Sequence, residues 1–485
     1  MRVYGMSYYG SRLKRYLQGL DWPLLVFLLL LLNVKLYIKV IAVVFAIILH
    51  RRTVFSFNRS APEQRFYGAM IVLALLNLLL SITTLSMASI LSFCMGSLYW
   101  LLAMMAARHI RLFVEQGDKE KIFRTLSFFF LLNALIVLFV FLGICIEAGT
   151  LNPYTYEGEH RKYFISTGDR ITGIGLDGSV ATAMISAFGL LYFFYRKKNV
   201  CALLSLATLL LATSNYIDLL LICVLLVAFF YRTDRVQKMM IGLYFFVMII
   251  FALKVYPENN QYAMKIMGQA VGKFPYIPAL AIPRPHMNDF VEGESTVSKR
   301  KQDSVLLATL YTPAKKDSIL KRYSGWDISG RWISWTQLKD FFIENPGRLL
   351  LGAGIGNFSS RLAFKTAALG IDGGYPKRAQ YISPFFRDNY LFLYLYYHSL
   401  EEGEHSVINK PDSVYGQLLA EYGLVGLFCF VLWYGIPFLR RIPQTQYGLP
   451  YLLLLAGAFF TEYWFEQLSI VILFELLILS DTHVS

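Results

Sequence analysis

Long runs of apolar residues are the feature that most limits what this chain can fold into. About twelve segments reach or approach the ~20 apolar residues with which an α-helix crosses the ~30 Å hydrocarbon layer of a bilayer. Hydrophobic residues make up 56% of the 485-residue chain and charged residues 16%, whereas a soluble domain carries about a quarter charged residues. These values exclude a soluble globular protein and predict an all-α, polytopic integral membrane protein.

We expect about twelve transmembrane helices. The first two apolar segments are short and could form one kinked helix, and the last two could merge. The expected spans are 20–33, 35–49, 66–85, 87–107, 125–147, 179–195, 199–213, 215–231, 239–256, 413–438, 449–463 and 466–480.

The positive charges predict the orientation of these spans. Lys and Arg collect at the N-terminus and in every second loop, whereas the short alternate loops carry only Lys35, Arg161, Lys162 and Arg170. Because basic loops stay in the cytoplasm, both termini are expected there. The formal net charge of +14 then reflects membrane anchoring, and we expect no nucleic acid partner.

The chain divides into three parts. Residues 1–256 are expected to form an N-terminal transmembrane bundle of about nine spans, and 413–485 the C-terminal spans. The segment 257–412 between spans nine and ten is too long for a structureless loop, so we expect a large helical extracytoplasmic domain. Within it, 331–345 has apolar residues at helical spacing before Asn345-Pro346. The glycines at 352 and 354 predict a tight turn with positive φ.

Several ionisable residues fall inside expected spans, where a charge is costly and is therefore a functional candidate. They are Lys35 with Lys39, Asp218 and Glu475. Each also has a structural interpretation: Lys35 can extend towards the interface, and Asp218 can pair within the bundle.

A stronger group of candidates lies on the predicted outer side. Arg170 lies shortly before the sixth expected span, and Arg331 lies in the sequence SGRWISW of the long outer segment. Acidic and imidazole groups collect before the tenth span: His398, Glu401, Glu402, Glu404, His405 and Asp412. The planar guanidinium group matches phosphate oxygens through two hydrogen bonds. This composition indicates an anionic, lipid-borne substrate.

Three motifs give the chain a family resemblance. RITGIGLDGSVATA, SGRWISWTQLKDFFIENPGRLLLGAGIGNF and PDSVYGQLLAEYGLVGLFCF resemble, in this order, stretches of the O-antigen ligase and polymerase superfamily. The layout also resembles that family, in which a large outer loop precedes a few last spans. The resemblance covers roughly residues 165 to 480.

The resemblance implies a GT-C-like fold and a metal-independent glycosyltransferase. The donor would be a glycan on undecaprenyl diphosphate, and the acceptor a sugar hydroxyl. Arg170 and Arg331 would stabilise the diphosphate leaving group, with Lys35 as a further cation. Tyr415 and Glu421, at the start of the next span, would bind substrate. No cofactor is implied, and the sequence has no HExxH or DxD motif to hold a metal.

Two departures from the family pattern concern the catalytic base. Many members carry His-Asn where this chain has Asp412-Ser413, and Ser-Arg where it has Ser214-Asn215. The acceptor hydroxyl needs a base within hydrogen-bond reach, and both His405 and Asp412 are candidates.

Three functions stay open at this point. The first is polymerisation of O-antigen or capsular repeat units, which we favour, because polymerases vary most in their motifs. The second is an O-antigen ligase that transfers glycan to a lipid core or a protein. The third is a transporter or flippase for lipid-linked glycan. The expected location is the bacterial inner membrane, with the large loop in the periplasm, beside other polysaccharide-assembly membrane proteins.

Overall fold

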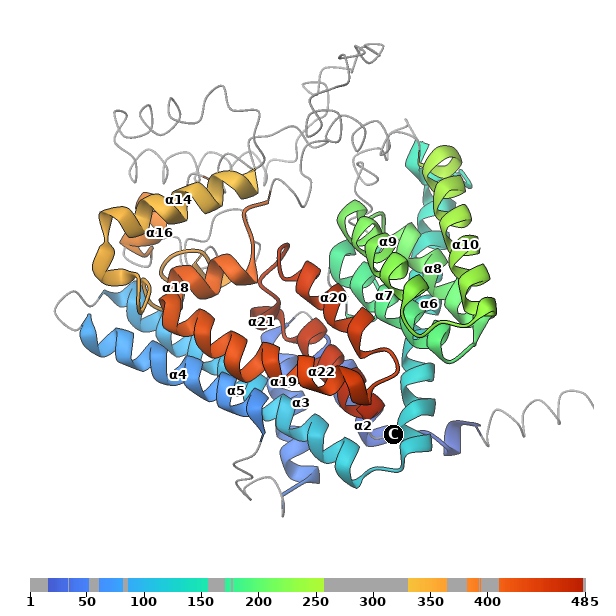
Figure 1. Ribbon diagram of the computed structural model, residues 1–485, viewed down its shortest axis with the longest axis horizontal. Coiled ribbons are helices and arrows are strands. Elements are labelled where there is room, and N and C mark those ends of the chain that lie inside the picture. Colours follow the sequence, from blue (N-terminus) through green and yellow to red (C-terminus); the bar gives the residue numbers. More distant parts are fainter. Residues whose placement is uncertain are drawn as a thin grey trace, which may run out of the picture.

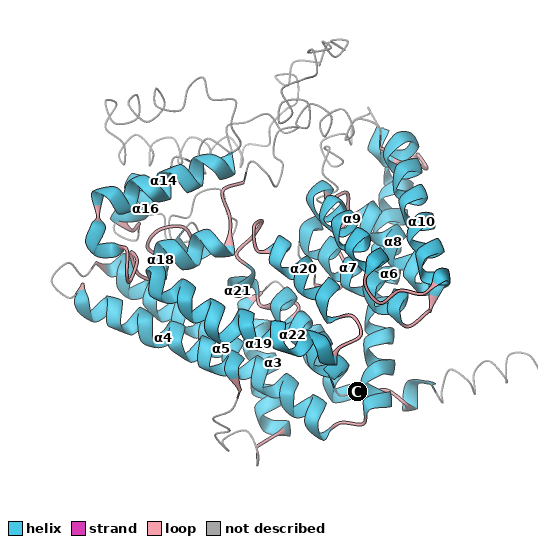
Figure 2. Ribbon diagram, viewed as in Figure 1, coloured by secondary structure: helices cyan, strands magenta, loops and turns pink. Residues whose placement is uncertain are grey.

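The computed structural model describes residues 16–33, 35–51, 61–81, 86–155, 171–175, 178–256, 330–363, 382–391, 393 and 410–482. Every regular element in these residues is a helix (Figures 1 and 2). Five helices or series of helices are long and apolar enough to cross a membrane: α4 (Pro62–Leu80), α5 (Met87–Gln116), α6 (Lys119–Ala148), α10 with η4 (Arg235–Val255), and the series from α18 to η10 (Val414–Gln444). The prediction of an all-helical chain with several candidate membrane spans is thus confirmed for the described residues.

The other apolar helices have 10 to 17 residues, and α7 has the predicted bounds, 179–195. They are α2 (Trp22–Leu31), α3 (Leu36–Leu49), α7 (Ser179–Tyr195), α8 (Asn199–Leu211), α9 (Asn215–Phe230), α20 (Gly448–Ala458) and α22 (Ser469–Thr482). The expected span 449–463 is the clearest difference, since its helix ends at Ala458. A helix of this length covers only about 16 Å. The number of twelve spans stays a prediction.

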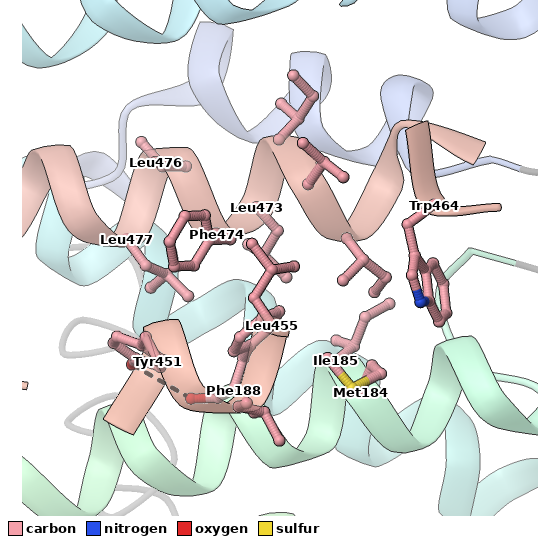
Figure 3. Packing of buried hydrophobic residues seen from close by; sticks show 14 of the residues in the cluster. Met184, Ile185, Phe188, Tyr451, Leu455, Trp464, Leu473, Phe474, Leu476 and Leu477 are labelled. Carbon is pink, nitrogen blue, oxygen red and sulfur yellow. Dashed lines mark hydrogen bonds between the residues drawn. The ribbon is translucent and has the colours of Figure 1, made fainter. Parts of the chain in front are cut away.

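The core of the bundle is built around α7 and α22. Nearly every residue of both helices is buried, which suits helices that are apolar on all sides. Figure 3 shows Ile185 and Phe188 of α7 facing α20, whose Tyr451 donates a hydrogen bond to the Phe188 carbonyl at 3.3 Å. Leu473 and Phe474 of α22 cover the other side of α20 (Figure 3).

The long series of helices that starts with α18 (Val414–Phe430) continues through η9 (Val431–Gly435), α19 (Ile436–Arg441) and η10 (Ile442–Gln444). It is broken at Gly423, whose φ is 66° and ψ −163°. The break frees backbone groups that a membrane protein must pair internally.

The glycine-rich turn 349–358 supplies the missing partners of α18. The N–H groups of Leu424 and Val425 donate to the carbonyls of Leu349 and Leu350, at 2.9 and 3.1 Å. The Ala353 N–H donates to the Ala420 carbonyl at 2.8 Å. These backbone bonds join the turn to the helix.

The glycines of this turn adopt the conformation that the sequence predicts. Gly352 and Gly354 have φ of 74° and 94°, which other residues rarely adopt. A Cβ atom on Gly352 would lie 2.4 Å from the backbone carbon of Glu421. Glycine is therefore needed here both for the turn and for the close approach of two backbones.

The described part of the long segment 257–412 lies over one end of the bundle (Figure 1). It contains α14 (Gly330–Glu344), η6 (Pro346–Arg348) and α16 (Pro384–Asn389). The helix predicted over 331–345 is thus confirmed. Leu338 and Phe341 of α14 pack in a second hydrophobic cluster with Phe358, Tyr390 and Ala420.

A second group of charges, which we call the terminal cluster, lies at the opposite end of the bundle. It consists of two buried glutamates, Glu63 and Glu475, and two partly buried arginines, Arg111 and Arg441. Arg111 donates a charged hydrogen bond to Glu63, and Arg441 lies 3.8 Å from the same carboxylate. The hydroxyl of Tyr67 donates to Glu475 at 2.5 Å. All of these residues lie on helices of the bundle, α4, α5, α19 and α22.

Candidate functional site

Arg331 occupies the first turn of α14, at the end that faces the beginning of α18. Its Nη2 donates a hydrogen bond to the backbone carbonyl of Lys410 at 3.2 Å. Burial lowers the pKa of the guanidinium group, while Tyr216, Asp412, Tyr390 and Glu462 oppose this shift. The arginine thus lies among acidic and phenolic groups that keep it charged.

Lys410 connects two carboxylates from different parts of the chain. Its Nζ lies 2.7 Å from Asp412 Oδ2 and 2.7 Å from Glu462 Oε1. Burial lowers the lysine pKa, but the two carboxylates outweigh burial, so the net shift is upward. Lys410 is therefore a fixed cation beside Arg331.

Asp412 is almost fully buried, with 4% of its surface exposed. It lies immediately before the N-cap of α18, Ser413. The hydroxyl of Tyr390 donates to the neighbouring Pro411 carbonyl at 2.8 Å. Burial and the charge of Asp412 raise the pKa of Tyr390, so this tyrosine stays neutral and acts as a hydrogen-bond donor.

Glu462 and Glu466 come from the connection between α20 and α22, which contains the short helix α21 (Trp464–Gln467). Glu462 accepts a hydrogen bond from Gln467 Nε2 at 3.3 Å, in addition to its contact with Lys410. Glu466 accepts from Gln417 Nε2 at 2.6 Å and from the Leu362 N–H at 2.9 Å. Because α20 is short, this polar connection enters the bundle. We call Arg331, Lys410, Asp412, Glu462 and Glu466 the site cluster.

A third cation, Arg361, adds to the site cluster. Burial raises the pKa of Glu462, and Lys410 and Arg361 oppose that shift. The charges of Arg331, Arg361 and Lys410 therefore all act on the carboxylate of Glu462. Cations fixed in a partly buried site are suited to bind phosphate oxygens.

Glu421 has a different role from the other acidic residues. Its Oε2 accepts from the Gly356 N–H at 2.8 Å and its Oε1 from the Phe358 N–H at 3.2 Å. The side chain is completely buried. Glu421, expected to bind substrate, thus has both oxygens bonded to the glycine-rich turn, a contact that holds this turn in place.

The structure brings together only some of the predicted site residues. Arg331 and Asp412 share the site cluster, and the Tyr415 hydroxyl donates to the Ala456 carbonyl at 3.0 Å, close to the end of α20. Lys35 lies in the turn between α2 and α3, where its N–H donates to Asn33 Oδ1 at 3.0 Å. Figure 1 draws these two helices at the end of the bundle away from α14.

Two predicted catalytic residues, Arg170 and His405, lie outside the described residues. Their predicted roles stay predictions. The same applies to His398, Glu401, Glu402 and Glu404.

Four residues at this site were not predicted from the sequence: Arg361, Lys410, Glu462 and Glu466. A signal was present for the two glutamates, because they are spaced i,i+4 within an otherwise apolar stretch, where acidic residues are costly. No comparable signal marks Lys410, since its partner Glu462 lies 52 positions later in the sequence. Among the residues that the structure describes, no group of three or more His, Cys, Asp or Glu side chains is arranged to hold a metal ion.

Comparisons with known proteins found no matching family model, no matching curated protein and no matching solved structure. The function must therefore be argued from the residues of the site cluster and from the motifs around it.

Proposed function

We propose that this protein transfers a glycan from a polyprenyl diphosphate carrier to a sugar hydroxyl at the outer face of a bacterial inner membrane. The observation that carries the proposal is the meeting of Arg331 with Lys410, Asp412 and Glu462 at one end of an apolar helical bundle. The resemblance of the surrounding motifs to the O-antigen ligase and polymerase superfamily supports the same reaction.

Arg331 and Lys410 are the proposed ligands of the donor diphosphate. As the bond between the anomeric carbon and the diphosphate oxygen breaks, negative charge grows on the leaving group. Fixed cations stabilise this charge without reorganisation during the reaction. Arg361 lies near enough to Glu462 to influence its charge and contributes to the same positive field.

Asp412 is the proposed base, with His405 as the alternative. The acceptor hydroxyl gives its proton to the carboxylate while its oxygen forms the new bond to the anomeric carbon. In the resting structure Asp412 is paired with Lys410 at 2.7 Å. When the diphosphate takes Lys410 as its partner, the carboxylate is released to act on the hydroxyl.

The bundle also suits a donor whose carrier is a long polyprenyl chain. Many apolar side chains on the long apolar helices face outward, including Phe139, Ile146, Met239 and Phe246. The carrier would lie in lipid beside these helices while its diphosphate reaches the site cluster.

Deleting the gene and separating the cell-surface glycans on a gel tests this proposal. Polymerisation, our preferred reaction, predicts loss of the long ladder with single repeat units still attached to their acceptor. A ligase predicts loss of all attached glycan, with polymer accumulating on the carrier. An unchanged profile would contradict both reactions and favour a transporter of lipid-linked glycan.

A further inference from the structure

Two buried glutamines beside the site cluster carry amide oxygens without a hydrogen-bond partner. They are Gln417 on α18, 2% exposed, and Gln467 on α21, 8% exposed. Neither Gln417 Oε1 nor Gln467 Oε1 has a partner within the part of the chain that the structure describes. A buried acceptor without a partner is unfavourable, and two such atoms beside one site call for an explanation.

The orientation of both amides follows from their other contacts. Gln417 Nε2 donates to Glu466 Oε1 at 2.6 Å, and Gln467 Nε2 donates to Glu462 Oε2 at 3.3 Å. An ionised carboxylate accepts hydrogen bonds and cannot donate them, so the NH₂ group of each glutamine must face the carboxylate. The carbonyl oxygen of each glutamine is consequently the atom left to meet a ligand.

The carboxylates next to these amides are already occupied. Glu462 bonds to Lys410 and Gln467, and Glu466 bonds to Gln417 and to the Leu362 N–H. The amide oxygens of Gln417 and Gln467, by contrast, have no partner among the described residues. Acceptors repel phosphate oxygens and attract hydroxyl groups.

We propose that Gln417 and Gln467 form a subsite for the hydroxyl groups of the acceptor sugar, next to the cations that bind the donor diphosphate. This inference rests on the proposed function and divides its site in two. The cationic side contains Arg331 and Lys410 and takes the diphosphate. The amide side takes a neutral, polyhydroxylated ligand.

Ser469, at the start of α22, is a further buried polar residue close in the sequence to Gln467. Ser469 is 3% exposed, and its Oγ has no hydrogen-bond partner among the described residues. It lies two positions after Gln467. A serine hydroxyl can both donate and accept, which matches a sugar hydroxyl and ring oxygen equally well.

The amide oxygens are closed to solvent. The long segment 257–412 is joined to this part of the bundle by the hydrogen bond from the Leu362 N–H to Glu466 Oε2 at 2.9 Å.

Binding measurements on the full-length protein in lipid nanodiscs test the division. The two probes are farnesyl diphosphate and the repeat-unit oligosaccharide released from the organism's own surface polysaccharide by mild acid. Gln417→Leu and Gln467→Leu should each weaken oligosaccharide binding by about tenfold, as expected for one lost hydrogen bond. Both should leave the affinity for farnesyl diphosphate unchanged. Arg331→Ala should show the reverse pattern.

The matched control is Gln237→Leu. Gln237 is also buried, but both ends of its amide are used: Oε1 accepts from the Asp234 N–H and Nε2 donates to the Phe194 carbonyl. This variant should bind both probes normally. If Gln417→Leu fails to fold, Gln417→His keeps a ring N–H donor for Glu466 and lacks the carbonyl, so it makes the same test.

The possible results separate the two proposals. Equal weakening of both probes by Gln417→Leu, or unchanged oligosaccharide binding, would overturn the acceptor subsite. In either case, loss of farnesyl diphosphate binding in Arg331→Ala would still support the proposed function. Unchanged farnesyl diphosphate binding in Arg331→Ala would instead contradict the proposed function itself.

Discussion

The terminal cluster and the site cluster both bury charges in an apolar bundle, but they are built from different kinds of segments. In the terminal cluster, Glu63, Arg111, Arg441 and Glu475 all project from helices of the bundle. In the site cluster, Arg331 begins a helix of the long segment, and Lys410 and Glu462 lie outside any helix. Charges on packed helices hold those helices together, whereas charges on connecting segments can exchange partners. We therefore expect the terminal cluster to contribute to stability and the site cluster to contribute to the proposed transfer.

The largest effect on stability is expected at the terminal cluster. Arg111→Ala leaves Glu63, 2% exposed, without its main partner, and breaking a buried pair in this way costs about 3–5 kcal/mol. We expect a lower thermal midpoint in nanodiscs, with the rate of glycan transfer per folded molecule unchanged. A fall in that rate as large as the one expected for Arg331→Ala would break the comparison.

The site cluster should show the opposite behaviour. Arg331→Ala should lower the rate of transfer by about 10²–10³-fold, the effect of removing one donor that stabilises developing negative charge. Membrane insertion and the thermal midpoint should change little.

Arg387→Ala is the matched control for Arg331→Ala. Arg387 also belongs to the long segment, but it is 38% exposed and bonds to the adjacent Asp388 at 2.7 Å. This variant should retain normal transfer. Normal transfer in Arg331→Ala as well would remove the site cluster from the reaction.

A substitution in the glycine-rich turn should have an intermediate effect on stability. Gly352→Ala introduces a Cβ at positive φ and against the backbone of Glu421, and it should cost about 1–3 kcal/mol. Gly143→Ala in α6 is the control, since nothing lies within 4 Å of its Cβ position. It should stabilise the helix by about 0.5–1 kcal/mol. Thermal unfolding of the two variants measures the difference, and equal midpoints would contradict the close approach.

The smallest effect should come from pH. Burial and Asp412 raise the pKa of Glu462 above its ordinary value of 4.5, although Lys410 opposes them. The folded protein then holds this proton to a higher pH than the unfolded chain does. The contribution of protonated Glu462 to the stability of the folded protein is complete below pH 4.5, and it is lost as the pH rises through the pKa of Glu462 in the folded state.

Glu462→Gln removes the titrating group and should flatten this dependence. The pKa of Lys410 is raised above 10.5, so its own contribution stays constant at neutral pH. Thermal midpoints of both proteins across the acidic and neutral range make the measurement. A dependence that is identical in the variant would assign the titration to another group.

The positions of the helices could be predicted from the sequence more readily than the contacts of the candidate site. The helix at 331–345 and the positive φ of Gly352 and Gly354 follow from local spacing and from the conformational freedom of glycine, so both could be predicted. The end of α20 at Ala458 was missed because the apolar pattern continues through Phe459 and Phe460. Local patterns thus identify a helix more reliably than its end.

The contacts within the site cluster could not be predicted from local sequence patterns, because they join residues far apart in the sequence. Arg331 bonds to Lys410, 79 positions later, and Lys410 to Glu462, 52 positions later. Such pairs depend on how the chain returns to the bundle. Arg331 and Asp412 were still predicted, because the motifs that resemble the O-antigen ligase and polymerase superfamily contain them.

The break in α18 at Gly423 bears on how the protein is assembled. The freed groups of Ala420, Leu424 and Val425 are paired by the glycine-rich turn, which precedes them in the chain by about 70 residues. Until that turn is in place, the residues at the break would expose unpaired backbone polar groups to hydrocarbon, which is energetically unfavourable. The order of synthesis meets this need, since the turn leaves the ribosome first. During biogenesis, the turn 349–358 would then already be in place to pair the backbone groups of α18 as this helix enters the membrane.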